Sequence, residues 1–205
     1  AVILLLVLAN YSDILRLQGA WKFSLAGFIL RLPMSIVGIS TILLVKAEYG
    51  NYTLAGAVSA ANMIALAVGA PILARLVDTR GQRKIMAPSF AVSALSLTGL
   101  VITALMQGPA LLLFLFAIAA GATWGAPGAL VRSRWMKVID SPERLSTAYA
   151  LEAAVDEFTF IIGPFLATML GTLVLPASGL VLAISFLSVG GFLFLSQTAS
   201  EPEPT

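Results

Sequence analysis

Residues 53–106 read TLAGAVSAANMIALAVGAPILA-RLVDTRGQRK-IMAPSFAVSALSLTGLVITALM, with two apolar segments on either side of a charged one. A helix needs about 20 mostly apolar residues to cross a bilayer, because each residue adds about 1.5 Å to a hydrocarbon core about 30 Å thick. Both apolar segments are long enough, and neither contains a charged residue. The pattern therefore predicts two membrane-spanning helices joined by a short basic turn.

Four other stretches meet the same criterion, so the sequence predicts six spans. We place them at residues 23–45, 53–74, 85–106, 109–131, 148–175 and 177–196, with a segment 1–22 before them and the start of a linker, 197–205, after them. Composition supports this prediction, because 59% of the residues are hydrophobic and 11% are charged, whereas soluble domains carry about 25% charged residues. The expected fold class is an all-α polytopic membrane protein.

The basic residues predict the orientation of the bundle, since short cytoplasmic loops collect Lys and Arg. Ten of the twelve basic residues lie before the first span, between the second and third, or between the fourth and fifth. The segment 1–22 and the tail are therefore expected in the cytoplasm. Membrane-flanking charges also explain the isoelectric point of 9.2, so nucleic-acid binding is not expected. The apolar run 1–9 is too short to span, and is either an interfacial segment or not the natural chain start.

Two residue types that carry much of enzyme chemistry are absent. The chain has no Cys, which excludes disulfides and thiolate metal sites, and no His, the commonest metal ligand and general base near neutral pH. Asp156 is the one Asp within a predicted span, so an aspartyl mechanism shared by two spans is not expected. We therefore predict no metal, no cofactor and no enzymatic activity.

The charged turn has a specific spacing. Asp78 stands three residues before Gly81 and five before Arg83, which Lys84 follows. A glycine suits a tight turn because it adopts positive φ freely, and the two basic residues can anchor the next helix to the anionic leaflet. The positive-inside rule explains the composition of this loop but not its spacing.

That spacing resembles the signature loop of the major facilitator superfamily, Gly-x-x-x-Asp-Arg/Lys-x-Gly-x-Arg-Arg/Lys, which joins the second and third helices. Asp78, Gly81, Arg83 and Lys84 match it, whereas Ala and Thr stand at positions 74 and 79 in place of the Gly and the first basic residue. The chain looks most like the efflux-type permeases of actinobacteria. These carry Arg-Leu-Pro in the first span, as at 31–33 here, and acidic residues in the fifth.

The resemblance implies one half of a major facilitator superfamily fold, in a twelve-helix transporter of the bacterial plasma membrane that works by alternating access. The chain would be the N-terminal half, and its partner the missing C-terminal half or a second copy. The resemblance also implies that Asp78 and Arg83 latch the two halves together at the cytoplasmic side in the outward-open state. The alternative is a self-contained six-span protein that forms a homodimeric pore or transporter.

Four charged residues lie within predicted spans: Arg31, Glu152, Asp156 and Glu157. A charge at the bilayer centre costs about 2.5–3.5 kcal/mol on insertion scales, so such groups must pair, face water or lose their charge. Arg31 and Asp156 each lie eight residues into a span that starts at the cytoplasmic face, so we expect them at equal depth. Glu152 is expected to be shallow enough to meet headgroups or the N-terminal end of its helix. One arginine cannot neutralise the remaining two acids, which predicts a surplus carboxylate.

A buried acid without a counter-ion takes up a proton readily, because low dielectric disfavours the charged form. We therefore hypothesise that Asp156 or Glu157 binds and releases a proton during transport, so that export of a small organic solute is coupled to proton entry. The competing interpretation is a static network in which Arg31 and the acids fix the first span against the fifth. Asn62 and Trp124 are candidates for the substrate cavity, although packing also explains Trp124.

Overall fold

The structure, a computed structural model, describes residues 11–204, and the apolar run 1–9 lies outside them. In chain order its α-helices are α2 (Ala20–Tyr49), α3 (Tyr52–Arg80), α4 (Gln82–Leu105), α5 (Ala110–Trp124), α6 (Pro127–Val138), α7 (Pro142–Leu173) and α8 (Ser178–Leu195). Single turns of 3-10 helix, η1 (Leu17–Gly19) and η2 (Thr198–Ser200), precede α2 and follow α8. Within residues 11–204, six helices, with α5 and α6 taken together, are long and apolar enough to cross a membrane. This confirms the predicted fold class.

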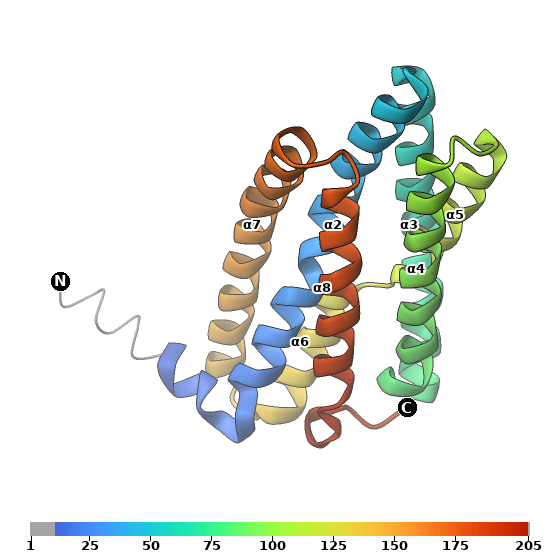
Figure 1. Cartoon of the computed structure of the whole chain (residues 1–205). Helices are drawn as coiled ribbons and strands as arrows, with labels where there is room; N and C mark the ends of the chain where they lie inside the picture. The colour runs from blue at the N-terminus through green and yellow to red at the C-terminus, as the bar shows by residue number, and fades with distance from the viewer. Residues whose placement is uncertain (1–10, 205) are drawn as a thin grey trace.

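Helix α2 lies at the centre of the bundle and packs against α3, α7 and α8 (Figure 1). Helix α5 packs against α3 and α4, and α4 also contacts α8. Four fully buried side chains of α2 follow one another at intervals of about two helical turns: Phe23, Leu30, Ile36 and Leu44. Each residue turns the helix by about 100°, so Ile36 lies about 120° around the helix from Leu30, and α2 contributes to the core from more than one side.

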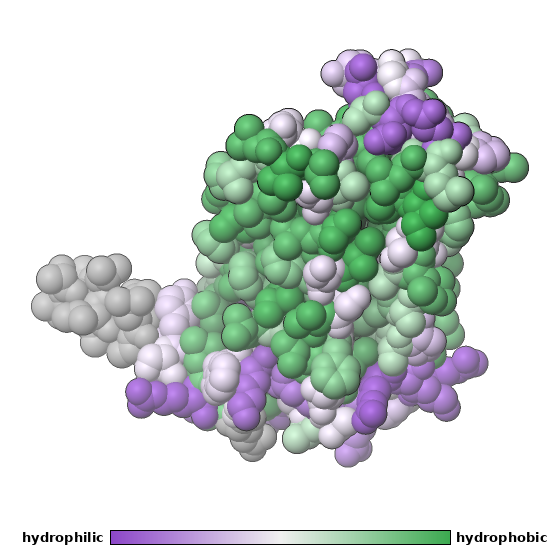
Figure 2. Space-filling model, in the orientation of Figure 1, coloured by the Kyte–Doolittle hydropathy of each residue, from purple (hydrophilic) through white to green (hydrophobic). Residues whose placement is uncertain are grey.

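The surface shows an apolar belt with hydrophilic side chains gathered toward the two ends of the bundle (Figure 2). Helices α2 and α7 begin, α8 ends, and α3 meets α4 at the same end (Figure 1). We call this the basic end, since six basic residues lie in or near these connections: Arg75, Arg80, Arg83, Lys84, Lys137 and Arg144. The distribution matches the loops that the sequence predicts to be cytoplasmic.

The fourth predicted span, 109–131, is two helices rather than one. Helix α5 ends at Trp124, and α6 runs from Pro127 to Val138. Gly125 has a φ of 76°, a left-handed conformation that glycine adopts without steric cost. Pro127 has no N–H and starts a helix more easily than it continues one. After the break, α6 extends seven residues beyond the predicted span. These seven residues include Arg132 and Arg134.

Candidate functional site

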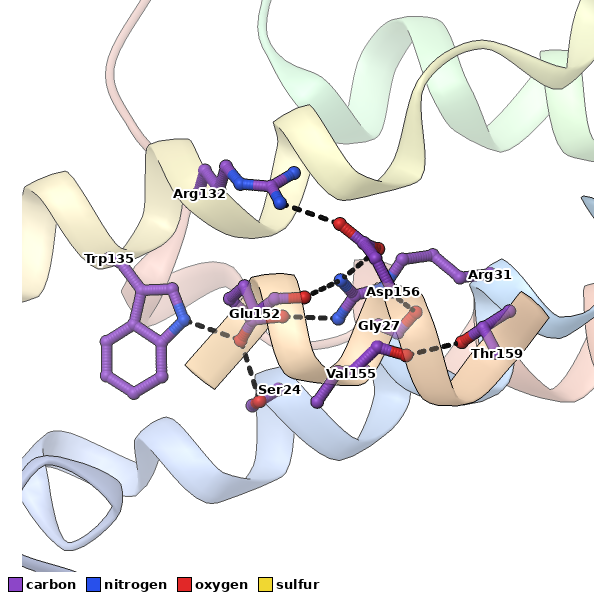
Figure 3. A network of polar contacts seen from close by, with 9 residues as sticks. All are labelled: Ser24, Gly27, Arg31, Arg132, Trp135, Glu152, Val155, Asp156 and Thr159. Carbon is purple, nitrogen blue, oxygen red and sulfur yellow. Dashed lines mark hydrogen bonds and ion pairs between the residues drawn. The ribbon is translucent and has the colours of Figure 1, made fainter. Parts of the chain in front are cut away.

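Arg31 is the centre of a polar network that joins α2, α6 and α7 (Figure 3). Its Nη2 pairs with Oε2 of Glu152, and its Nη1 lies 2.9 Å from Oδ1 of Asp156. Its Nε donates to the carbonyl oxygen of Gly27 at 3.1 Å. The structure thus brings Arg31 and Asp156 together, and the Arg31 side chain is only 4% exposed.

Glu152 lies at the buried side of this network. Its side chain is 0% exposed, and Oε1 accepts hydrogen bonds from Ser24 Oγ at 2.8 Å and Trp135 Nε1 at 2.7 Å. The expectation that Glu152 meets headgroups or its own helix end is therefore wrong. Helix α7 begins at Pro142, before the predicted span, so Glu152 lies almost three turns into the helix.

Asp156 is held by two guanidinium groups, one on each carboxylate oxygen. Arg31 contacts Oδ1, and Arg132 Nη2 lies 2.6 Å from Oδ2. The Arg132 and Asp156 side chains are 34% and 30% exposed, so this pair reaches the surface of the described chain. Arg132 escaped the sequence analysis because hydropathy ends the span at residue 131, one residue before it.

The network is balanced in charge, with two guanidinium groups and two carboxylates. The network itself therefore contains no surplus acid, because Arg132 supplies the second cation. The acid of the fifth predicted span that is left over is Glu157. Glu157 is exposed, and among residues 11–204 its side chain takes part in no hydrogen bond or ion pair. Glu157 is rotated about 100° from Asp156 around α7, which separates it from the four charges of the network.

Two adjacent cavities lie beside the network. The larger, of about 510 Å³, is lined by Arg31, Arg132 and Asp156 together with mostly apolar residues. The smaller has a volume of about 220 Å³. Its lining includes Asn62 and Trp124 and contains no charged residue. The two cavities share four lining residues: Met34, Met63, Leu66 and Phe160. Both residues predicted for a substrate cavity thus line one cavity, next to the charge network.

Two of the four polar side-chain atoms that line the smaller cavity are bonded to backbone. Asn62 Nδ2 donates to the carbonyl oxygen of Ala117 at 2.8 Å, and Ser93 Oγ donates to that of Ala120 at 2.9 Å. Trp124 is 5% exposed, and its indole Nε1 has no hydrogen-bond partner within the described chain. The cavity wall is therefore mostly apolar, and the indole N–H of Trp124 and Oδ1 of Asn62 are its polar atoms without a hydrogen bond inside the described chain.

The turn between α3 and α4 lies at the basic end and consists of Gly81 alone. Gly81 has a φ of 91°, in the region that favours glycine, as the tight turn required. The side chains of Asp78, Arg83 and Lys84 are exposed around it. Asp78, Arg83 and Lys84 thus share one exposed surface at the end of the bundle, whereas Gly81 is buried in the turn between them.

A second polar cluster, centred on Arg134, ties the segment after α8 to the basic end. The Arg134 side chain is fully buried, and its Nε donates to Gln82 Oε1 at 2.9 Å. Its Nη1 donates to the carbonyl oxygen of Gln197 at 2.6 Å and to Ser200 Oγ at 2.8 Å. The guanidinium also lies 4.0 Å from the centre of the Phe194 ring, close enough for a cation–π contact.

Glu201 completes the attachment of this segment. Its Oε1 accepts from the backbone N–H of Arg83 at 2.8 Å, at the N-terminus of α4, where a carboxylate interacts favourably with the helix dipole. Its carbonyl oxygen accepts from Lys137 Nζ at 2.6 Å. The sequence does not predict this cluster, since Arg134 lies past the predicted fourth span and the Glu-Pro repeat has a linker's composition.

The family model described as Major Facilitator Superfamily matches residues 23–205 of the chain. The match covers nearly all of α2 and every later helix. A search of the curated proteins finds none that matches the chain.

Proposed function

Since this chain belongs to the Major Facilitator Superfamily, and is accordingly a membrane transporter rather than an enzyme, we propose that it exports a small organic solute in exchange for protons. In this proposal its six helices form one half of an efflux-type permease of a bacterial plasma membrane, with the basic end in the cytoplasm. The other half is a second six-helix unit, and transport proceeds by alternating access. The observation that carries the proposal is the position of Asp156, between two arginines and at the wall of a cavity.

Asp156 is the acid that we propose as the proton carrier. It lines the larger cavity and is about a third exposed, whereas Glu152 is fully buried and bonded to three donor residues. Protonation would weaken the contacts of Asp156 with Arg31 and Arg132, because a neutral carboxyl attracts a guanidinium less strongly. The charge of Asp156 would thereby control a contact between α6 and α7.

Glu157 supports the presence of a second six-helix unit. It is exposed on α7 beside exposed apolar residues, Phe158 and Ile161. A carboxylate within a spanning helix faces protein or water rather than lipid, because lipid does not solvate its charge. The second unit is either a further segment of the transporter or a second copy, which would give a homodimeric pore or transporter. Cross-linking in native membranes that detects no self-association would overturn the homodimer.

We assign the exposed loop residues a role in closing the basic end. Asp78 and Arg83 would contact the second unit in the outward-open state, as the match to the signature loop implies. Their exposure at the basic end supports this role. Asp78→Asn is then expected to lower transport several-fold with no change in the amount of protein in the membrane.

Proton movement in proteoliposomes tests the coupling. Protein is reconstituted with a trapped pH-sensitive dye, and organic cations, anions and neutral solutes are added one at a time outside. We expect at least one solute to drive proton movement, and Asp156→Asn to abolish it. Glu157→Gln tests the other candidate carrier, and Glu143→Gln is the matched control, since Glu143 is an exposed acid in the first turn of α7. Proton movement that persists in both test variants would leave the static network as the correct interpretation.

A further inference from the structure

We propose that the two cavities bind an organic cation with an apolar, aromatic-sized body, whose positive charge replaces Arg132 on Asp156. The proposal rests on the proposed transport function and adds the chemical class of the solute. Two features of the site support it. The contact between Arg132 and Asp156 can open, and the cavities are lined mostly by apolar residues.

The Arg31 side of the network is closed. Arg31 is 4% exposed, and all three of its guanidinium nitrogens are hydrogen-bonded, to Gly27, Glu152 and Asp156. Arg31 therefore has no uncommitted nitrogen for an anionic solute. Opening this side would also leave a buried charge unpaired, which is strongly destabilising.

The Arg132 side of the network can open. Arg132 is 34% exposed, and among residues 11–204 its guanidinium pairs with Asp156 alone, through Oδ2. Its long side chain can turn toward the water at the basic end, since such side chains keep a charged head in water while the stem lies along apolar surface. Asp156 has a short side chain and stays paired with Arg31 when Arg132 leaves.

Charge balance favours a cation over an anion in this exchange. When Arg132 turns into water, Arg31, Glu152 and Asp156 together carry one negative charge in excess. A bound cation restores neutrality, whereas a bound anion next to the intact network adds an unbalanced negative charge in a region of low dielectric. The ionisable side chains lining the two cavities are Arg31, Arg132 and Asp156.

The smaller cavity suits the apolar body of the solute. Its volume of about 220 Å³ is bounded by Trp124 and Phe160 and by the flexible side chains of Met34 and Met63, and methionine adapts to ligands of different shape. The donors of Asn62 and Ser93 are already bonded to backbone. The aromatic rings can also attract a cation directly. An acceptor atom on the solute could use the free indole N–H of Trp124.

Equilibrium dialysis of the purified full-length transporter with two probes of one shape and opposite charge tests the proposal. The probes are benzyltrimethylammonium and phenylmethanesulfonate. We expect the cation to bind at least tenfold more tightly than the anion. Asp156→Asn should weaken cation binding at least tenfold, whereas Asp156→Glu, which keeps the charge, should retain it. Arg132→Gln should strengthen cation binding, because the competing guanidinium is gone. The control Glu143→Gln should change nothing.

Three results would overturn the cation site: tighter binding of the anion, binding of neither probe, or loss of cation binding in Arg132→Gln. The proteoliposome assay separates these failures from failure of the proposed function. Proton movement driven by an anionic or neutral solute and lost in Asp156→Asn would leave the proton-coupled exporter intact while the cation site falls. Cation binding that depends on Asp156, with no proton movement for any solute, would leave the cation site intact while the coupling falls.

Discussion

Arg31 and Glu152 lie 121 residues apart in the sequence and form an ion pair whose two side chains are 4% and 0% exposed. Because α2 carries one partner and α7 the other, this pair fixes two helices of the bundle against each other. It also divides the network into a closed part, Arg31 with Glu152, and an open part, Asp156 with Arg132.

The two arginines of the network should differ in their contribution to stability. Arg31→Gln should lower the free energy of unfolding by about 3–5 kcal/mol, because it leaves the buried Glu152 without its cation. Arg132→Gln should cost about 1 kcal/mol or less, because the pair it removes is about a third exposed. Denaturation in mixed micelles, followed by circular dichroism, measures both. Equal losses would show that the two pairs are equally buried in the membrane.

The contact between α3 and α5 depends on Gly121. A Cβ atom at this position would overlap the backbone carbonyl of Asn62, which cannot rotate away as a side chain can. Gly121→Ala should therefore destabilise the bundle by about 1–3 kcal/mol. Gly56→Ala is the matched control in α3, since a Cβ there meets nothing within 4 Å and alanine favours the helix. The same denaturation experiment compares the two, and a neutral Gly121→Ala would contradict this packing.

The segment after α8 should be released by loss of Arg134. The chain has no Cys, so a single introduced thiol reports exposure without background. Ser200→Cys lies at a site 7% exposed and should react slowly with a maleimide, but at least tenfold faster when Arg134→Gln is added. Thr198→Cys, at an exposed position of the same turn, should react fast in both backgrounds. An unchanged rate at position 200 would mean that Arg134 does not hold the segment.

Thiol labelling also tests the predicted orientation. Tyr52 is 71% exposed at the end opposite the basic end, and Glu143 is exposed at the basic end. In intact cells, a membrane-impermeant maleimide should label Tyr52→Cys directly and Glu143→Cys only after permeabilisation. The reverse pattern would place the basic end outside the cell.

The candidate site could be predicted only in part. The sequence pointed to Arg31 and Asp156 through their equal distance from the start of their spans, and the structure brings them together. The depth of Glu152 was predicted wrongly. Hydropathy gives the bounds of the apolar stretch, whereas α7 begins earlier, at Pro142. Arg132 was missed for the same reason, since a helix continues past its apolar stretch.

The sequence by itself determined the number of spans, the all-helical fold class and the family of the signature loop. These properties depend on lengths of apolar chain and on local spacing, which the bilayer and the turn impose residue by residue. Only the tertiary structure decided that Glu152 is closed in, that Arg132 balances Asp156 and that Arg134 holds the segment after α8. Each of these contacts joins residues from different segments of the chain. The packing of side chains, rather than any local pattern, selects which charges meet.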